Sequence, residues 1–184
     1  MVAFLSKQVN VRRVLITGAE STGKSELAMG LARHYGGIYI PEYAREYVEK
    51  LDRPCVYSDV EHIAEWQKKA YQDTQAPGSF VFFDTWLIIT RVWFEVVFHQ
   101  VPSWLDDQIR QASFDLVLLC HTDLPWISDG VRENGGERRE WLQERYQELI
   151  RLNGWDFYTV DGLGGERLTK AIQLIDKFKN HGES

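Results

Sequence analysis

The 184-residue sequence predicts an α/β domain in which a five-stranded parallel sheet lies between two layers of helices. The first observation is the order of the elements, because short apolar runs alternate with helix-length amphipathic stretches. The second is that these runs are apolar throughout, as in strands buried on both faces of a parallel sheet. The length fits one domain, residues 1–184.

In the first half of the chain, glycine, proline and capping residues separate the expected elements. Leu27, Leu31 and Tyr35 recur every four residues and predict a helix after the first strand, which Gly36 ends. Residues 58–61, Ser-Asp-Val-Glu, match a capping box that opens a longer helix. The expected strands are 14–17, 38–40 and 80–83, and the further expected helices are 42–51, 58–76 and 86–98.

The second half continues the alternation of strands and helices. Leu142, Tyr146 and Leu149 share one side of a charged helix. The apolar helix at 86–98 is expected to pack in the core, and a homodimer face is its second interpretation. The remaining expected elements are helices at 104–112, 137–152 and 166–180 and strands at 116–120 and 156–160.

Composition and charge exclude several classes of protein. The formal net charge of -6 leaves no basic footprint of the kind that a nucleic-acid partner requires. The apolar stretch at 86–98 contains Arg91 and Glu95 and is shorter than the ~20 residues of a membrane helix. Two cysteines cannot build a disulfide framework, and the first 13 residues lack an apolar export segment. A cytoplasmic protein is therefore expected.

A phosphate-binding loop is the firmest motif. Gly18 and Gly23 bracket four residues and Lys24-Ser25 follow, as in G-x-x-x-x-G-K-[ST]. The glycines let backbone N–H groups face phosphate oxygens, Lys24 adds a cation, and Ser25 offers a hydroxyl to Mg²⁺. A strand before the loop and a helix after it disfavour a chance glycine-rich turn. The sequence predicts a P-loop NTPase that binds ATP and Mg²⁺ through Gly18, Ala19, Glu20, Ser21, Thr22, Gly23, Lys24 and Ser25.

Asp84 is the expected metal partner of that loop. It directly follows the third apolar strand, and ligands of parallel sheets lie at the carboxyl ends of the strands. An aspartate there suits a ligand of Mg²⁺ or a catalytic group. The alternative is a helix N-cap for the helix that follows.

The acceptor of the phosphoryl group is expected beside the second and third strand ends. Glu42 is predicted to bind or deprotonate an acceptor hydroxyl, and Tyr43 and Arg45 are predicted to contact the acceptor. The alternative for Arg45 is a surface pair with Glu42. Thr85 and Trp86 are predicted on the same substrate side.

Residues 123–140 are predicted to form a lid. Glycines allow movement, and the arginines Arg132, Arg138 and Arg139 could neutralise charge on the transferring group and the bound nucleotide. The alternative is a solvated loop and helix face, expected for at least one of Arg138 and Arg139. Trp126 is expected either to stack on a substrate ring or to pack the base of the lid.

Missing motifs narrow the reaction class. No Asn-Lys-x-Asp sequence follows a strand, which disfavours a Ras-like GTPase, and no apolar strand ends in Asp-Glu as in motor and transporter ATPases. Phosphoryl transfer from ATP to a small hydroxyl compound suits the remaining features best. The alternative is a regulatory P-loop ATPase module whose nucleotide state changes a protein contact, carried by the helix at 86–98.

Together the motifs resemble the ribosylnicotinamide kinase domain of NadR-type proteins. They are Gly-Ala-Glu-Ser-Thr-Gly-Lys-Ser at 18–25, Glu-Tyr-Ala-Arg-Glu-Tyr at 42–47, Phe-Asp-Thr at 83–85, Pro-Trp at 125–126 and Asp-Gly-Val-Arg at 129–132. The resemblance implies a nucleoside-monophosphate-kinase-like fold and Mg-ATP-dependent phosphorylation of the 5′-hydroxyl of nicotinamide riboside, a step of NAD salvage. It also implies roles for single residues: Asp84 between metal and acceptor, Glu42, Tyr43 and Arg45 in the acceptor pocket, and Trp126, Asp129 and Arg132 in the lid.

The chain departs from the family pattern in two respects. It lacks an adenylyltransferase domain with a His-x-x-His signature, so a kinase without adenylyl transfer is expected. The family has Asp-Thr-Asp where this chain has Asp-Thr-Trp at 84–86. Trp86 is expected to offer stacking in place of the acid, or to mark a branch with another substrate.

Overall fold

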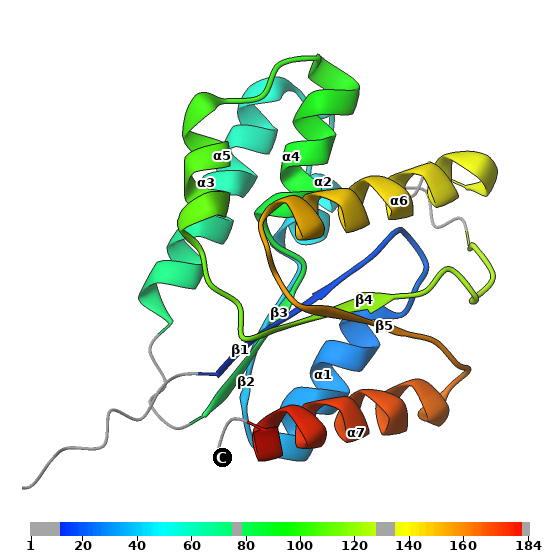
Figure 1. Cartoon of the computed structure of the whole chain (residues 1–184). Helices are drawn as coiled ribbons and strands as arrows, with labels where there is room; N and C mark the ends of the chain where they lie inside the picture. The colour runs from blue at the N-terminus through cyan, green and yellow to red at the C-terminus, as the bar shows by residue number, and fades with distance from the viewer. Residues whose placement is uncertain (1–11, 75–78, 128–134, 182–184) are drawn as a thin grey trace, which may run out of the picture.

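The computed structural model describes residues 12–74, 79–127 and 135–181, and its strands form one parallel sheet. The strand order is β2-β3-β1-β4-β5 (Figure 1). The strands are β1 (Arg12–Thr17), β2 (Ile38–Ile40), β3 (Phe80–Asp84), β4 (Leu116–Cys120) and β5 (Phe157–Val160). The five-stranded parallel sheet is confirmed. Because the chain leaves β1 toward one edge of the sheet and later returns to the other, a ligand site is expected at the carboxyl end of β1.

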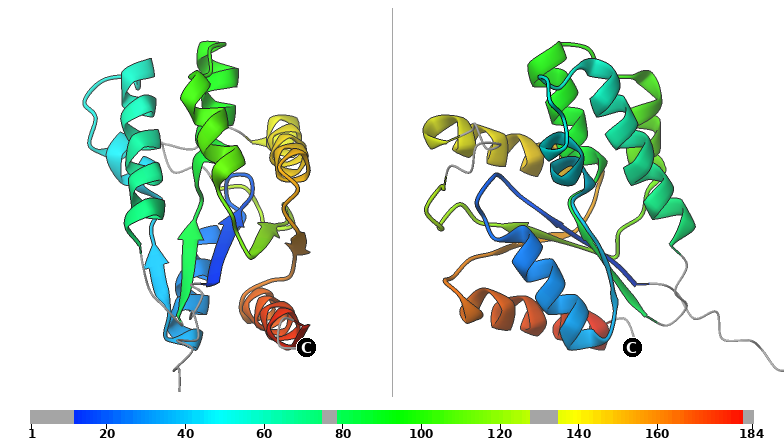
Figure 2. Two further views of the ribbon diagram at one scale, coloured as in Figure 1. Left: turned by 60° about the vertical axis from the view of Figure 1, so that its left-hand side comes forward. Right: turned by 180° about the vertical axis from the view of Figure 1, so that it is seen from behind.

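Helices cover both faces of this sheet, as Figures 1 and 2 show. Helices α1 and α7 lie side by side on one face, and α3, α4, α5 and α6 pack on the other. The helices are α1 (Lys24–Tyr35), α2 (Tyr43–Glu49), α3 (Tyr57–Asp73), α4 (Leu87–Trp93), α5 (Ser103–Gln111), α6 (Gly136–Leu152) and α7 (Gly165–His181), with a π-helical turn η1 (Phe94–Phe98) after α4.

Alternate residues of the central strands supply two hydrophobic cores. In β1, Val14 and Ile16 pack with α1 and α7, whereas Leu15 packs with the helices of the opposite face. The edge strands differ, because Ile38 in β2 and Tyr158 in β5 are exposed. The prediction that every strand is buried on both faces is therefore wrong for the two edges, which have a neighbouring strand on one side only.

Local signals placed most helix ends correctly. Helix α1 ends where Gly36 takes a left-handed φ of 60° and donates its N–H to the Ala32 carbonyl. Helix α3 instead begins at Tyr57, and the Val56 N–H donates to the Asp59 carboxylate over 2.8 Å. The predicted capping box at 58–61 is wrong, because Asp59 occupies the third helical position and caps the helix from there.

The apolar helix expected at 86–98 is a core element. Its side chains Leu87, Ile88, Val92 and Phe94 are each at most 1% exposed. The core interpretation is thus confirmed for most of its length. Within the described part of the chain, no helix combines the length and the apolar character needed to cross a membrane.

Candidate active site at the strand ends

The turn between β1 and α1 has the backbone of a phosphate-binding loop. Gly18 and Gly23 adopt φ values of 141° and 75°, and a Cβ built on Gly18 would lie 2.7 Å from the Cys120 carbonyl oxygen. Ser21 is also left-handed, with φ of 56°, which is uncommon outside glycine. The loop is therefore held in a strained shape, as functional loops often are.

Lys24 opens α1 and lies between the loop and the end of β3. Its Nζ donates to the Ala19 carbonyl over 2.9 Å, and the Thr22 hydroxyl donates to the same oxygen over 2.8 Å. The Lys24 charge also acts on Asp84, where it lowers the carboxyl pKa. The Lys24 ammonium thus lies within reach of the Asp84 carboxylate and of a phosphate group bound in the loop.

Asp84 ends β3 directly beside β1, because Asp84 pairs with Ile16 in the parallel register. Burial raises the pKa of Asp84, and contacts with Ser25, Lys24 and Tyr39 oppose that rise. The Tyr39 hydroxyl donates to Oδ2 over 3.1 Å, whereas Oδ1 is buried without a hydrogen-bond partner among the described residues. An unpartnered carboxylate oxygen near a serine hydroxyl fits a hard divalent cation.

Tyr39 is a site residue that the sequence did not reveal. It belongs to β2, and its pairing with Phe82 sets it two positions before Asp84 on the neighbouring strand. Burial and the Asp84 charge raise the Tyr39 pKa, so the hydroxyl stays a proton donor. The sequence offered only a tyrosine near the end of a short strand. Its contact with Asp84 could not be predicted without knowing that β2 lies beside β3.

Glu42 and Arg45 face the same strand ends from α2. Glu42 is the residue that precedes α2, and its charge adds to burial in raising the pKa of both Tyr39 and Tyr146. The Arg45 charge acts on Asp84 and opposes the effect of burial on its pKa. The structure therefore brings Glu42, Arg45 and Asp84 to one edge of the sheet.

Tyr43 faces α3 rather than the sheet. Its ring stacks on Trp66 with centroids 4.4 Å apart and an interplanar angle of 15°. Its hydroxyl lies 3.0 Å from the His62 Nε2. Arg45 donates from Nε to Glu49 over 2.9 Å along the same helix. The contact of Tyr43 and Arg45 with an acceptor stays a prediction.

Trp86 does not belong to the substrate side. Its side chain is 2% exposed and its Nε1 donates to the Gln67 carbonyl over 3.1 Å. The predicted stacking on a substrate is wrong, because other rings surround the indole: Tyr71, Phe114 and Trp155. Thr85 is also buried, at φ of 64°, and its N–H donates to the Ile16 carbonyl over 2.9 Å. Substrate contact by Thr85 stays a prediction.

The start of the predicted lid packs on the phosphate loop. Trp126 Nε1 donates to Glu20 Oε2 over 3.3 Å, and a Cβ built on Gly135 would meet the Trp126 ring at 3.2 Å. The Ile127 N–H donates to the Ser21 hydroxyl over 3.2 Å. These contacts are those of a ring that packs the base of the segment, which is one of the two interpretations of Trp126.

The arginines of this segment separate into different environments. Arg139 is buried and donates to phosphate-loop carbonyls and to the Leu124 carbonyl. Arg138, its neighbour on α6, is exposed to solvent. A nucleotide contact by Arg138 stays a prediction. Asp129 and Arg132 lie outside the described residues.

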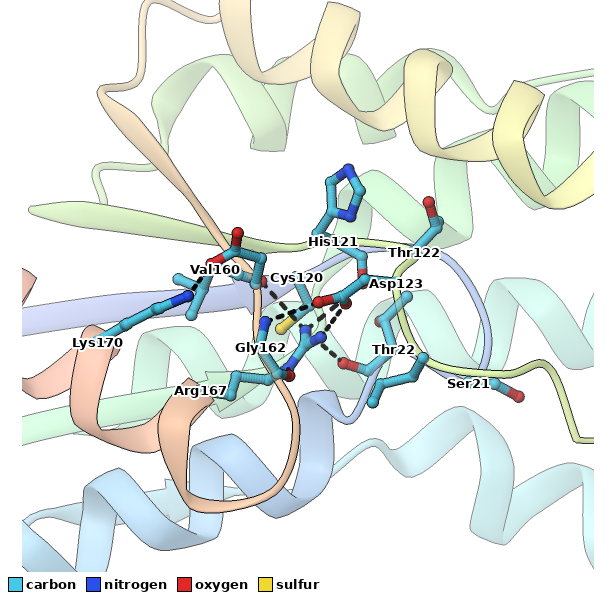
Figure 3. A network of polar contacts seen from close by, with 12 residues as sticks. Ser21, Thr22, Cys120, His121, Thr122, Asp123, Val160, Gly162, Arg167 and Lys170 are labelled. Atoms are coloured by element: carbon cyan, nitrogen blue, oxygen red, sulfur yellow. Dashed lines mark hydrogen bonds and ion pairs between the residues drawn. The ribbon is translucent and has the colours of Figure 1, made fainter.

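Asp123, the first residue of the predicted lid segment, contacts α7 and the turn after β5. Figure 3 shows Arg167 from α7 reaching it beneath the loop, where the two side chains form an ion pair. The Arg167 guanidinium also donates to the Thr22 and Val160 carbonyls, over 2.9 and 3.1 Å. Asp123 accepts the Gly162 N–H over 2.7 Å. Sequence reasoning missed Arg167, because no motif marks a residue so far along the chain.

Comparisons of sequence agree with this geometry. A family model described as an AAA domain matches residues 13–167. The trifunctional NAD biosynthesis/regulator protein NadR of Salmonella typhimurium is 30% identical over 173 residues, which cover 90% of this chain and 42% of the relative. NadR of Escherichia coli K12 is 30% identical over 174 residues, with the same coverage. The chain thus spans less than half the length of these curated relatives.

Solved structures give the same result. A NadR protein in complex with NR superposes with a TM-score of 0.77 at 26% identity, covering 91% of this chain and 51% of that one. A NadR complex with NAD and AMP-PNP gives 0.73 at 25% identity, covering 91% and 49%. A deoxyadenosine kinase from M. mycoides gives 0.58 at 20% identity over 92% and 98% of the two chains. This last likeness concerns the fold alone, and the kinase-like P-loop fold is confirmed.

Proposed function

This chain belongs to the AAA domain family, and from that premise we propose that it is a kinase that phosphorylates the 5′-hydroxyl of nicotinamide riboside with ATP. One observation carries the proposal: Lys24, Ser25 and Asp84 meet beside a strained phosphate loop at the carboxyl end of β1. The likeness to NadR structures with NR and with AMP-PNP supports these two substrates.

The nucleotide side supplies electrostatic stabilisation. Phosphates of ATP lie against backbone N–H groups of the loop other than that of Ala19, which donates to Gln143, at the N-terminus of α1. The Lys24 ammonium moves from its loop carbonyl to the β- and γ-phosphates, where it neutralises charge on the group in transfer. In this proposal Arg132 and Arg138 contribute positive charge to the bound phosphates, and Trp126 and Asp129 belong to the same lid segment of the sequence.

Ser25 and Asp84 would hold a magnesium ion. The Ser25 hydroxyl and the Asp84 Oδ1, which has no hydrogen-bond partner among the described residues, would offer the oxygen ligands that this ion prefers, together with the phosphates of the nucleotide. Bound there, Mg²⁺ supplies charge neutralisation on the phosphates. The described residues contain no cluster of three acidic, histidine or cysteine side chains that could hold a metal without the nucleotide.

Glu42 takes the proton of the acceptor hydroxyl. It follows β2 by two residues, and its charge acts on both Tyr39 and Tyr146. As the hydroxyl oxygen bonds to the γ-phosphorus, the bond to the β-phosphate oxygen breaks, ADP leaves, and the hydroxyl proton passes to Glu42. Tyr43, Arg45 and Thr85 line the pocket that orients the riboside.

The test is a direct assay of the purified protein. With Mg-ATP and nicotinamide riboside it should form ADP and nicotinamide mononucleotide in equal amounts, detected by chromatography and mass spectrometry. Chelation of the metal should stop the reaction, and a panel of other nucleosides should react more slowly. Nucleotide binding without phosphorylation of any nucleoside in the panel would overturn the proposal.

The regulatory alternative has less support. It requires a contact surface on the helix at 86–98, and most of that helix is buried in the core of this chain. A homodimer through the same helix faces the same difficulty. We therefore propose no second function.

A further inference from the structure

We propose that Arg139 is a positioning residue that fixes the phosphate loop from behind and thereby sets its affinity for nucleotide. The inference rests on the proposed function only in taking an adenine nucleotide as the ligand. Arg139 lies on α6, 119 residues from the loop carbonyl of Glu20 that it contacts. The residue is expected to act through the loop, without touching the reacting atoms.

The argument begins with the carbonyl groups of the loop. When backbone N–H groups turn inward toward phosphate oxygens, the carbonyls turn outward into the protein, where each one needs a donor. Every carbonyl from Ala19 to Gly23 has such a donor in this structure. The donors are the Thr22 hydroxyl and Lys24 for Ala19, Arg139 for Glu20 and Ser21, Arg167 for Thr22, and the Leu27 N–H for Gly23.

Arg139 satisfies the strained centre of the loop. Its Nε donates to the Glu20 carbonyl over 2.9 Å, and one terminal nitrogen donates to the Ser21 carbonyl over 3.1 Å. The other terminal nitrogen donates to the Leu124 carbonyl over 2.9 Å. The guanidinium presents its N–H groups from three separate nitrogens in a fixed plane, whereas a lysine has a single nitrogen, so lysine is expected to reproduce only part of these contacts.

Gln143 is a second residue of α6 that contacts the phosphate loop. It lies one turn after Arg139, and its Oε1 accepts the Ala19 N–H over 2.8 Å. Its Nε2 donates to the Cys120 carbonyl over 2.8 Å, which ties the same residue to β4. Two side chains of one helix face therefore hold the loop in position. The left-handed Ser21 would relax without them, because strained backbone persists only where its surroundings hold it.

The positive charge of Arg139 also favours nucleotide binding. The residue is 6% exposed, and its guanidinium stays protonated at any physiological pH. A buried positive charge directly behind the loop is weakly screened by salt and favours anionic phosphate groups in front of it.

The experiment compares Arg139→Lys and Arg139→Ala with the unmodified chain. The dissociation constant for AMP-PNP, measured by calorimetry, should rise at least about tenfold in both variants, while the KM for nicotinamide riboside stays within about twofold. Added guanidinium should restore part of the affinity of the alanine variant and none of the lysine variant. A thermal melting curve of each variant shows whether it is folded.

Arg151→Lys is the matched control, because Arg151 is an exposed arginine of the same helix. Its affinity for AMP-PNP should equal that of the unmodified chain. AMP-PNP affinity within twofold of normal in a folded Arg139→Lys protein would overturn the inference. If the alanine variant does not fold, the lysine variant decides the matter alone. Since AMP-PNP binding needs no acceptor, failure of the riboside assay would count against the proposed function only.

Discussion

The nucleotide side and the acceptor side of this molecule are built in different ways. The phosphate loop is held by hydrogen bonds with three buried side chains, Gln143, Arg139 and Arg167, which are more than 100 residues away in sequence. Helix α2 on the acceptor side has no buried residue, and its ion pairs are exposed contacts one turn apart. The phosphate loop is thus anchored in the core, whereas the proposed acceptor side is built at the surface, where substitutions cost the fold less.

The two sides meet at Asp84. Its carboxylate accepts a hydrogen bond from Tyr39, whose strand β2 leads toward α2, and the Ser25 side chain in the first turn of α1 also acts on it. Variants on either side, and at this junction, should therefore separate effects on nucleotide, chemistry and stability.

The largest effect is expected from Lys24→Ala. Removing the cation that neutralises the γ-phosphoryl group should lower kcat roughly 1000-fold or more, whereas the melting temperature should change little. Steady-state kinetics with nicotinamide riboside measure it. Lys177→Ala, which removes an exposed lysine of α7, is the control and should keep full activity. A loss of less than tenfold would mean that the loop binds nucleotide without directing catalysis.

Asp84→Asn tests the junction. Loss of the carboxylate should reduce kcat roughly 100- to 1000-fold by weakening the metal site.

The same variant also changes the pH dependence of stability. Burial raises the pKa of Asp84, so the ionised form is unfavourable in the fold and stability falls as pH rises through the raised pKa. The asparagine variant should lack that fall and melt no lower than the parent at pH 7. Full activity together with unchanged metal dependence would remove Asp84 from the site.

Trp86→Phe tests whether Trp86 serves the hydrophobic core or the acceptor pocket. The smaller ring loses packing and the hydrogen bond to Gln67, so the free energy of unfolding should fall by about 1–3 kcal/mol. Urea denaturation measures this. The KM for nicotinamide riboside should stay unchanged, because the indole is buried in the core. A several-fold rise in that KM, with stability intact, would return Trp86 to the acceptor pocket.

The smallest effect is expected from Asp59→Asn, beneath the acceptor helix. The Arg53 guanidinium, followed by the Val56 N–H and the Tyr47 hydroxyl, holds the pKa of Asp59 well below its usual 3.8. The stability it contributes is fully present above that usual value and is lost as pH falls below it. The variant should melt roughly 2–5 °C lower at pH 7.

A pH series provides the sharper readout for Asp59. The melting temperature of the unmodified chain, measured by differential scanning fluorimetry, should fall more steeply than that of the variant between roughly pH 5 and pH 3. Asp107→Asn breaks an exposed ion pair with Arg110 and serves as the control with almost no change. Parallel curves for the two proteins would show that Asp59 is not the group responsible.

Much of the fold follows from short-range sequence signals. Apolar runs located all five strands, and Gly36 located the end of α1, because each of these features depends on neighbouring residues. The start of α3 was misplaced, since Ser58 and Asp59 can both cap a helix and only packing selects between them. The burial of the edge strands β2 and β5 was overestimated, because a strand's place at the edge depends on the strand order, which is not a local property.

The sequence by itself determined the phosphate loop at 18–25, because its residues are contiguous and its glycines permit the left-handed turns at Gly18 and Gly23. Only the tertiary structure decided what surrounds it. Tyr39 joins Asp84 through strand order, Trp86 turns into the core, and Arg139 and Arg167 reach the loop from α6 and α7. The physical reason is that side-chain partners from distant elements depend on how the layers pack, which no local pattern encodes.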